Sequence, residues 1–247
     1  MCLGFWDYHF SDARNLLKQM FSFCKIILWV GPKHSGKTTA AARLAEKAKK
    51  DGFRVAGILE PSIYKNEKLA GFDIVDLNSR KRTILARRKK DNELFSFTSK
   101  GLRLGRAALS KKAAGEADLI IVDEYGLLEL AGKGWRKCVD KLAFSTTAFL
   151  ILVVRKELAG RIKKLYKNFI IQQFNTANKN SVNKILLMLK ENKKIYNEIK
   201  KYSRKNQISC ESCFRIASEL NVPLKMVGRI CDDKKIKICF CQLGCFK

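Results

Sequence analysis

The residues with the clearest chemical potential lie in a short stretch that begins at Gly31. Four residues separate Gly31 from Gly36, and Lys37, Thr38 and Thr39 follow directly. The glycines let the backbone curl so that successive N–H groups face one point, where a lysine can reach phosphate and a hydroxyl can bind Mg²⁺. This spacing predicts a phosphate-binding loop for a nucleoside triphosphate. Its predicted binding residues are Gly31, Pro32, Lys33, His34, Ser35, Gly36, Lys37, Thr38 and Thr39.

The flanks of this loop are those that the chemistry requires. An apolar run of strand length, residues 26–30, precedes Gly31. Residues 40–48 are mostly strong helix formers and follow the Lys-Thr pair. The helix would place the positive end of its dipole at the phosphates.

A second stretch supplies the acidic half of such a site. Residues 119–122 are apolar and are followed by Asp123 and Glu124, as expected of a buried parallel strand with acids at its carboxyl end. Ligands of α/β sheets gather at that end. We therefore predict that Lys37, Asp123 and Glu124 are catalytic. Asp123 would hold Mg²⁺ together with Thr38, and Glu124 would orient or deprotonate the attacking water.

The elements that must position these residues alternate between strands and helices. Strands are predicted at 53–59, 70–77, 83–86, 148–154 and 169–173, and helices at 101–114, 133–142 and 178–201. The pattern predicts an α/β fold, a three-layer sandwich with a mainly parallel sheet. Arg155 follows the strand at 148–154, where it would either stabilise charge on a transferred phosphoryl group or form a surface salt bridge.

Composition narrows the class of protein. The 247 residues carry 50 Lys and Arg against 23 Asp and Glu, a formal charge of +27. Such a charge indicates either a polyanionic partner, nucleic acid or an anionic surface, or a coding bias toward Lys, Ile and Asn. The apolar segments are too short for a membrane span of about 18 residues, and acidic residues interrupt the N-terminus where a signal peptide would lie. We therefore expect a cytoplasmic protein whose nine cysteines are thiols or metal ligands.

With these residues in view, the segment from about Lys25 to Asn192 resembles the nucleoside-triphosphatase family first described from thermophiles, a group of small P-loop NTPases. Three passages carry the resemblance: the loop with Gly31, Gly36, Lys37 and Thr38, the Gly-Phe-Asp-Ile-Val-Asp-Leu run at 71–77, and residues 122–129. The middle passage is the most specific of the three.

The resemblance implies a P-loop fold and Mg²⁺-dependent hydrolysis of ATP or GTP to NDP and phosphate. It carries phosphate and metal binding over to Lys37 and Thr38, and the metal and water roles to Asp123 and Glu124. Glu129 matches an acid of the family whose role is open. The chain departs from the family at Tyr125, at Leu127-Leu128 and in residues 57–61, so its base preference is open.

Residues beyond about Tyr202 differ in character. Ala217, Asn221, Val227 and Ile230 have the spacing of a helix-turn-helix, with Ser209 as a cap and Pro223 in the first turn of the second helix. A strand at 234–241 would complete a small winged-helix-like module. Lys225 and Arg229 would then contact DNA. Many ordinary helix pairs share this spacing, so packing alone is the competing interpretation.

Cysteines of the same segment give a second hypothesis. Cys210 and Cys213 are separated by two residues, and Cys239, Cys241 and Cys245 follow. Thiolates at such spacings can hold zinc or an iron–sulfur cluster. The alternative is that they are small buried side chains in a reducing compartment.

The chain is thus predicted to have three parts: an extension at 1–24, a P-loop NTPase domain at 25–192 and a cysteine-rich module at 193–247. The leading hypothesis for function is Mg²⁺-dependent hydrolysis of nucleoside triphosphates. The alternatives are a nucleotide-responsive regulator that binds DNA or a protein, and a kinase for a small molecule.

Overall fold

The computed structural model describes residues 26–89, 94–169, 171–178 and 180–240. The chain divides into two compact units, and the division falls at residue 190. Each unit is described by itself below. No helix in the described ranges is long and apolar enough to cross a membrane.

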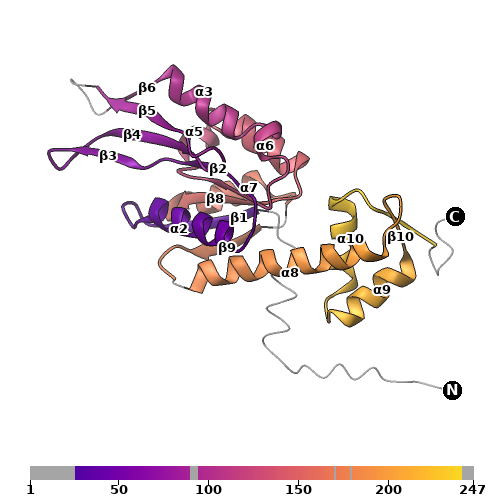
Figure 1. The fold of residues 1–247 in the computed structure, drawn as a ribbon. Coiled ribbons are helices and arrows are strands. Elements are labelled where there is room, and N and C mark those ends of the chain that lie inside the picture. Colours follow the sequence, from indigo (N-terminus) through magenta and orange to yellow (C-terminus); the bar gives the residue numbers. More distant parts are fainter. Residues whose placement is uncertain (1–25, 90–93, 170, 179, 241–247) are drawn as a thin grey trace. The chain divides into compact units, whose positions relative to one another are not determined.

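A nine-stranded mixed sheet forms the centre of the first unit (Figure 1). Five of its strands run parallel, and they are, in spatial order, β9 (Ile171–Asn175), β1 (Ile26–Gly31), β8 (Phe149–Arg155), β7 (Leu119–Val122) and β2 (Val55–Leu59). Strands β1, β2, β7 and β8 are buried almost throughout, which explains their near-continuous apolar sequences. The prediction of an α/β fold with a mainly parallel sheet is confirmed.

Helices cover both faces of this parallel part. Alternate strand residues such as Leu28, Ile120 and Leu152 share one core cluster with residues of α3 (Ser99–Ala108), α4 (Lys111–Ala114), α6 (Arg136–Ser145) and α7 (Ala159–Leu165). Helix α2 (Lys37–Lys50) contacts β2 and β8 and lies on the opposite side of the sheet from α3 and α6 (Figure 1).

Four antiparallel strands extend the sheet beyond β2. They are β3 (Ser62–Lys65), β4 (Lys68–Asp76), β5 (Arg82–Arg88) and β6 (Phe95–Phe97). Positive φ angles of 48° and 62° at Asn66 and Glu67 close the hairpin between β3 and β4. The short strands β3 and β6 have too few residues to show a clear period, so the sequence did not predict them.

One predicted helix is divided in the structure. The sequence predicted a single helix over residues 101–114, but α3 ends at Ala108 and α4 begins at Lys111. The Ser110 hydroxyl accepts a hydrogen bond from the Ala113 N–H at 3.3 Å and so begins a new helix. Two further short elements, α5 (Leu127–Leu130) and the 3₁₀ turn η1 (Lys156–Leu158), complete the unit.

The second unit has its own apolar core. Helix α8 (Asn180–Tyr202) contributes Ile195 and Ile199, and the core continues through β10 (Gln207–Ser209), α9 (Cys210–Glu219), α10 (Leu224–Asp233) and β11 (Lys237–Cys239). Ser209 caps α9, as predicted, and Pro223 is the residue before α10. The strands β10 and β11 pair in parallel, whereas a wing is an antiparallel hairpin. The predicted strand at 234–241 is therefore present in part, in a different pairing.

Candidate active site

The predicted phosphate-binding loop joins the end of β1 to α2. Gly36, with φ of 75°, is the residue before the helix, and His34 also has a positive φ of 59°. Ser35 donates a hydrogen bond to the Pro32 carbonyl at 2.8 Å. The loop residues 32–36 are exposed, whereas Lys37 is 5% exposed. The loop thus has the curled backbone and the helix N-terminus that a phosphate group requires.

The sheet brings this loop to the second acidic stretch. Strand β8 lies between β1 and β7, and all three run in the same direction, so the carboxyl ends of β1 and β7 lie at one edge. The Thr38 side chain is hydrogen-bonded to Asp123, which is 0% exposed. Thr38 and Asp123, which are 85 positions apart in the sequence, therefore lie in one site.

Asp123 is held by its surroundings. Its two carboxyl oxygens accept hydrogen bonds from the N–H groups of Glu60, at 3.1 Å, and Glu124, at 3.0 Å. Burial raises the pKa of Asp123 to about 6, although the hydrogen bonds from Thr38 and Glu60 act in the opposite direction. A nearby cation would stabilise the ionised form of this buried carboxyl group.

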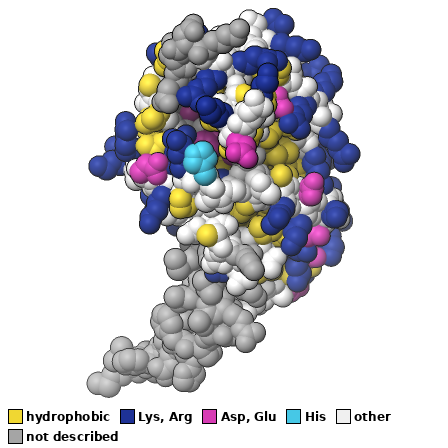
Figure 2. Space-filling model, turned by 90° about the vertical axis from the view of Figure 1, so that its left-hand side faces the viewer, with side chains coloured by type: hydrophobic (Ala, Val, Ile, Leu, Met, Phe, Trp, Pro, Cys, Tyr) yellow, Lys and Arg dark blue, Asp and Glu magenta, His cyan; other side chains and the backbone are white. Residues whose placement is uncertain are grey.

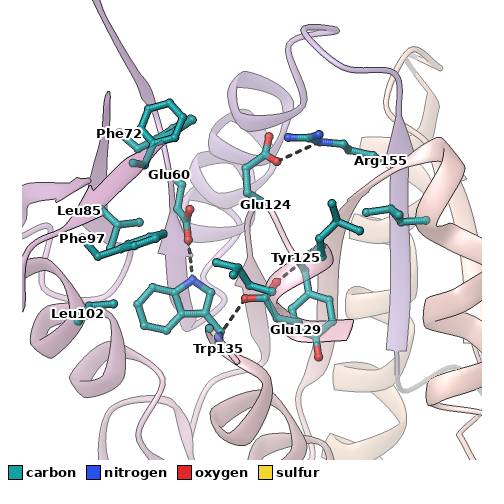
Figure 3. Close-up of a pocket in the computed structure, with 16 residues that line it drawn as sticks. Glu60, Phe72, Leu85, Phe97, Leu102, Glu124, Tyr125, Glu129, Trp135 and Arg155 are labelled. Atoms are coloured by element: carbon teal, nitrogen blue, oxygen red, sulfur yellow. Dashed lines mark hydrogen bonds and ion pairs between the residues drawn. The ribbon is translucent and has the colours of Figure 1, made fainter. Parts of the chain in front are cut away.

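Glu124 sits between the two positive side chains of the site. Its Oε1 lies 4.0 Å from Lys37 Nζ, and its Oε2 lies 3.7 Å from the Nε of Arg155 (Figure 3). Its backbone has a φ of 48°, in the left-handed region that few residues other than glycine adopt. Such strained residues are concentrated at functional sites. The sequence left Arg155 either a phosphoryl-stabilising role or a surface salt bridge. In the structure Arg155 faces Glu124 and forms an ion pair with it.

The donors at this edge suit Mg²⁺. A hydroxyl from Thr38 and a carboxyl from Asp123 are hard oxygen ligands, and Mg²⁺ in nucleotide sites takes one or two such protein ligands with the substrate phosphates and water. The Asp123 carboxyl is fully buried, and a bound cation would supply the counter-charge that a buried carboxylate needs. The residues present therefore fit the metal that the fold implies.

Two nearby residues were not identified from the sequence. Glu60, directly after β2, accepts a hydrogen bond from Trp135 Nε1 at 2.6 Å, and burial raises its pKa well above the ordinary value. In the sequence, Glu60 falls within residues 57–61, where the chain departs from the family pattern. Nothing in the local sequence around Trp135 indicated a polar partner, because the partner is 75 residues away.

Glu129 has a structural role in this fold. Its two oxygens accept hydrogen bonds from the backbone N–H groups of Gly126, at 2.8 Å, and Trp135, at 3.0 Å. The first contact begins α5, and the second fixes the chain before α6. The three-residue spacing of Gly126 and Glu129 is that of a capping box and could have indicated this role.

A cavity of about 220 Å³ opens beside Glu124 (Figure 3). Glu124 and Arg155 lie at one end, Glu60 lies between Phe72 and Glu124 in the view, and Trp135 lies below Glu60. Apolar side chains from the antiparallel strands and from α3 and α5 complete its wall: Phe72, Leu85, Phe95, Phe97, Leu102, Leu127 and Leu128.

The face shown in Figure 2 is rich in lysine and arginine side chains, with few acidic ones between them. A positive surface of this kind attracts anions such as nucleoside triphosphates. The same charge would also attract nucleic acid, so it does not by itself separate the two ligands.

The described cysteines of the second unit, Cys210, Cys213, Cys231 and Cys239, are not gathered into one cluster. The Cys213 thiol is hydrogen-bonded to Cys231, both in the core, whereas Cys239 donates to the Ile208 carbonyl at 3.3 Å. Among the described residues, no group of three or more His, Cys, Asp or Glu is placed to hold a metal ion. Cys241 and Cys245 lie outside the described residues, so the zinc or iron–sulfur hypothesis stays a prediction.

The chain is similar in sequence to known nucleoside-triphosphatases. The nucleoside-triphosphatase THEP1 of Methanothermobacter thermautotrophicus is 32% identical over 150 residues, which cover 56% of this chain and 80% of the relative. The protein of the same name from Thermotoga maritima is 29% identical over 174 residues, 68% of this chain and 97% of the relative.

Two solved structures share the fold. A human cancer-related nucleoside triphosphatase and THEP1 from Aquifex aeolicus each superpose with a TM-score of 0.50 at 19% identity and cover 66% of this chain. The matched regions span 94% of the human chain and 98% of the Aquifex aeolicus chain. The sequence profile of the NTPase family matches residues 26–187, which hold the phosphate-binding loop, Asp123 and Glu124. The chain therefore belongs to the NTPase family.

Proposed function

We propose that the chain hydrolyses nucleoside triphosphates to NDP and phosphate, with Lys37, Asp123 and Glu124 as its catalytic residues. The backbone N–H groups of residues 33–39 and the ammonium group of Lys37 bind the β- and γ-phosphates. Glu124 accepts a proton from a water whose oxygen bonds to the γ-phosphorus. The bond between that phosphorus and the β–γ bridging oxygen breaks, and the bridging oxygen leaves with NDP.

One observation carries this proposal. The structure brings the loop and the acidic stretch together, so that Glu124 Oε1 is 4.0 Å from Lys37 Nζ and Thr38 is hydrogen-bonded to Asp123. A base beside the group that binds the γ-phosphate is the arrangement that directs water at phosphorus. Family membership and the THEP1 relatives point to the same reaction.

Release of phosphate from ATP and GTP tests the proposal. Lys37→Ala should reduce kcat/KM by a factor of about 100 or more, since one preorganised charge contributes about that much. Glu124→Gln should reduce kcat by a factor of about 100 to 10,000, the usual contribution of a general base. Lys47→Ala and Glu46→Gln, on the exposed side of α2, are matched controls that should behave as the wild type. Full activity in Glu124→Gln would refute the assigned role.

The same proposal assigns Mg²⁺ to Thr38 and Asp123. When bound, the ion would neutralise charge that develops on the phosphate oxygens. The protein residues contribute the hydroxyl and the buried carboxylate that hold it. Isothermal titration of Mg²⁺ with a non-hydrolysable ATP analogue should show tight binding to the wild type and at least tenfold weaker binding to Asp123→Ala, because a carboxylate ligand is lost.

For the rest of the chain the predictions stand as proposals. The division into parts at 1–24, 25–192 and 193–247 is one of them. DNA contact by α10 is another: Lys225 is exposed, and the guanidinium of Arg229 lies 4.0 Å from Asp233. DNA binding by the full chain that weakens steeply with salt, and weakens further in Lys225→Ala, would support that contact.

A further inference from the structure

The cavity beside Glu124 is larger than hydrolysis requires. A water nucleophile occupies about 30 Å³, whereas this cavity has a volume of about 220 Å³. An engineered protein cavity of about 150 Å³ binds benzene, so the space here is enough for a single ring with small substituents. The cavity lies next to Glu124, and none of residues 31–39 lines it, so there is room for a second molecule beside the nucleotide phosphates.

Aromatic rings form much of its wall. Phe72 and Phe95 pack with ring centroids 5.1 Å apart, and Phe97 and Trp135 also line the space. Three large apolar side chains of the wall are strongly exposed: Phe97 by 45%, Leu127 by 59% and Leu128 by 44%. Apolar side chains that are exposed around one cavity favour a ligand that covers them.

Polar groups lie at two places in this apolar wall. Glu124 and Arg155 are at the end toward the phosphate-binding loop (Figure 3). Glu60 faces Trp135, where one carboxyl oxygen accepts from Trp135 Nε1 and the second has no hydrogen-bond partner among the described residues. A carboxyl oxygen in either protonation state accepts a hydrogen bond, so a ligand N–H suits this place.

We propose that the cavity binds a small aromatic ring that carries an N–H donor and a hydroxyl group, and that the hydroxyl of this ligand accepts the γ-phosphoryl group. The ring lies among Phe72, Phe97 and Trp135, its N–H group donates to Glu60, and its hydroxyl faces Glu124. This inference rests on the proposed function, because it uses the same nucleotide and the same base. It adds an acceptor to the site.

The transfer is balanced without a further reactant. The ligand oxygen bonds to the γ-phosphorus, the bond to the β–γ bridging oxygen breaks, and NDP leaves. Glu124 takes the hydroxyl proton, as it does from water. Arg155 is beside Glu124 and faces the cavity, where it can stabilise charge on the phosphoryl group.

Ring binding is tested first, without nucleotide. The probe is 4-aminobenzyl alcohol, observed by saturation-transfer NMR and titrated for its Kd. Phe97→Ala should weaken the Kd by a factor of about five to ten, since an aromatic contact contributes about 1 kcal/mol. Phe144→Ala removes a ring that is 77% exposed and outside the cavity, and it should leave the Kd unchanged. Phe97 is itself half-exposed, so its loss should leave the thermal unfolding midpoint within a few degrees of the wild type.

The transfer step is tested by ³¹P NMR with Mg²⁺ and ATP. The expected product is the phosphate ester of 4-aminobenzyl alcohol, and 4-methylaniline, which lacks the hydroxyl, should give none. Failure of the probe to bind, or binding that Phe97→Ala does not weaken, would overturn the site. Binding with inorganic phosphate as the sole product would overturn the acceptor role. A sample that forms neither product refutes the proposed function and the transfer together, whereas the binding measurement still decides whether the cavity is a site.

Discussion

Buried Asp123 should make the stability of the Mg²⁺-free protein depend on pH. Its pKa is about 6 in the folded state and 3.8 for the ordinary side chain. Because the folded pKa is raised, the folded protein holds the proton more tightly, and stability falls as pH rises from 3.8 through 6. The full penalty, reached above pH 6, is about 3 kcal/mol from a shift of about two units.

Between pH 5 and pH 8, ionisation of Asp123 lowers the free energy of unfolding by about 1.4 kcal/mol. The reference protein is Asp123→Asn, whose amide does not titrate. This variant leaves one backbone N–H, of Glu60 or Glu124, without its acceptor, and that cost does not change with pH. The wild type should therefore lose about 1.4 kcal/mol relative to the variant over this range.

Urea unfolding at pH 5, 6, 7 and 8 in the presence of a chelator measures the difference. Trp29 and Trp135 both lie in the first unit and report its unfolding by fluorescence. Addition of Mg²⁺ should stabilise the wild type more at pH 8 than at pH 5, since at pH 5 about one Asp123 in ten is ionised. The variant should show no such difference. If the difference in unfolding free energy between the wild type and Asp123→Asn does not change with pH, the raised pKa of Asp123 is refuted.

Two backbone positions give further predictions. Gly57 has a φ of 112°, and an added Cβ would lie 1.9 Å from the Ile121 carbonyl oxygen, so Gly57→Ala should lower the free energy of unfolding by about 3 kcal/mol or more. Gly160→Ala, with open space around it, is the control and should be neutral or stabilising. Glu124→Gly should be more stable than Glu124→Ala by about 1 kcal/mol, because φ at this position is 48°, while both variants lose phosphate release. Equal urea midpoints for the Glu124 pair would argue against backbone strain there.

Sequence reasoning succeeded where function depends on local pattern. The loop from Gly31 to Thr39 needs consecutive residues in one backbone shape, and that shape requires glycine and a following helix. The strand before Asp123 is buried on both faces, so its apolar run was visible. Parallel strands then bring the two stretches to one edge by geometry alone.

The second half of the site depends on contacts that no local pattern encodes. Glu60 meets Trp135 across 75 residues, and Phe72 meets Phe95 from separate strands. Strands β3 and β6 have four and three residues, too few for alternation to be recognised. In the second unit the sequence did not predict the parallel pairing of β10 with β11, because this pairing depends on how α9 and α10 fold between the two strands.

The sheet divides the chemistry between its two parts. Its parallel part and the helix after β1 hold Lys37, Asp123 and Glu124, the residues proposed to break the phosphoanhydride bond. The antiparallel part holds no phosphate-binding group of this site but supplies Phe72, Phe95 and Phe97, which wall the space in front of Glu124. Whatever oxygen occupies that space when the γ-phosphate arrives becomes the acceptor. On the proposed acceptor role, the antiparallel strands decide between water and a second substrate, and changes to them should alter the product rather than the affinity for the nucleotide.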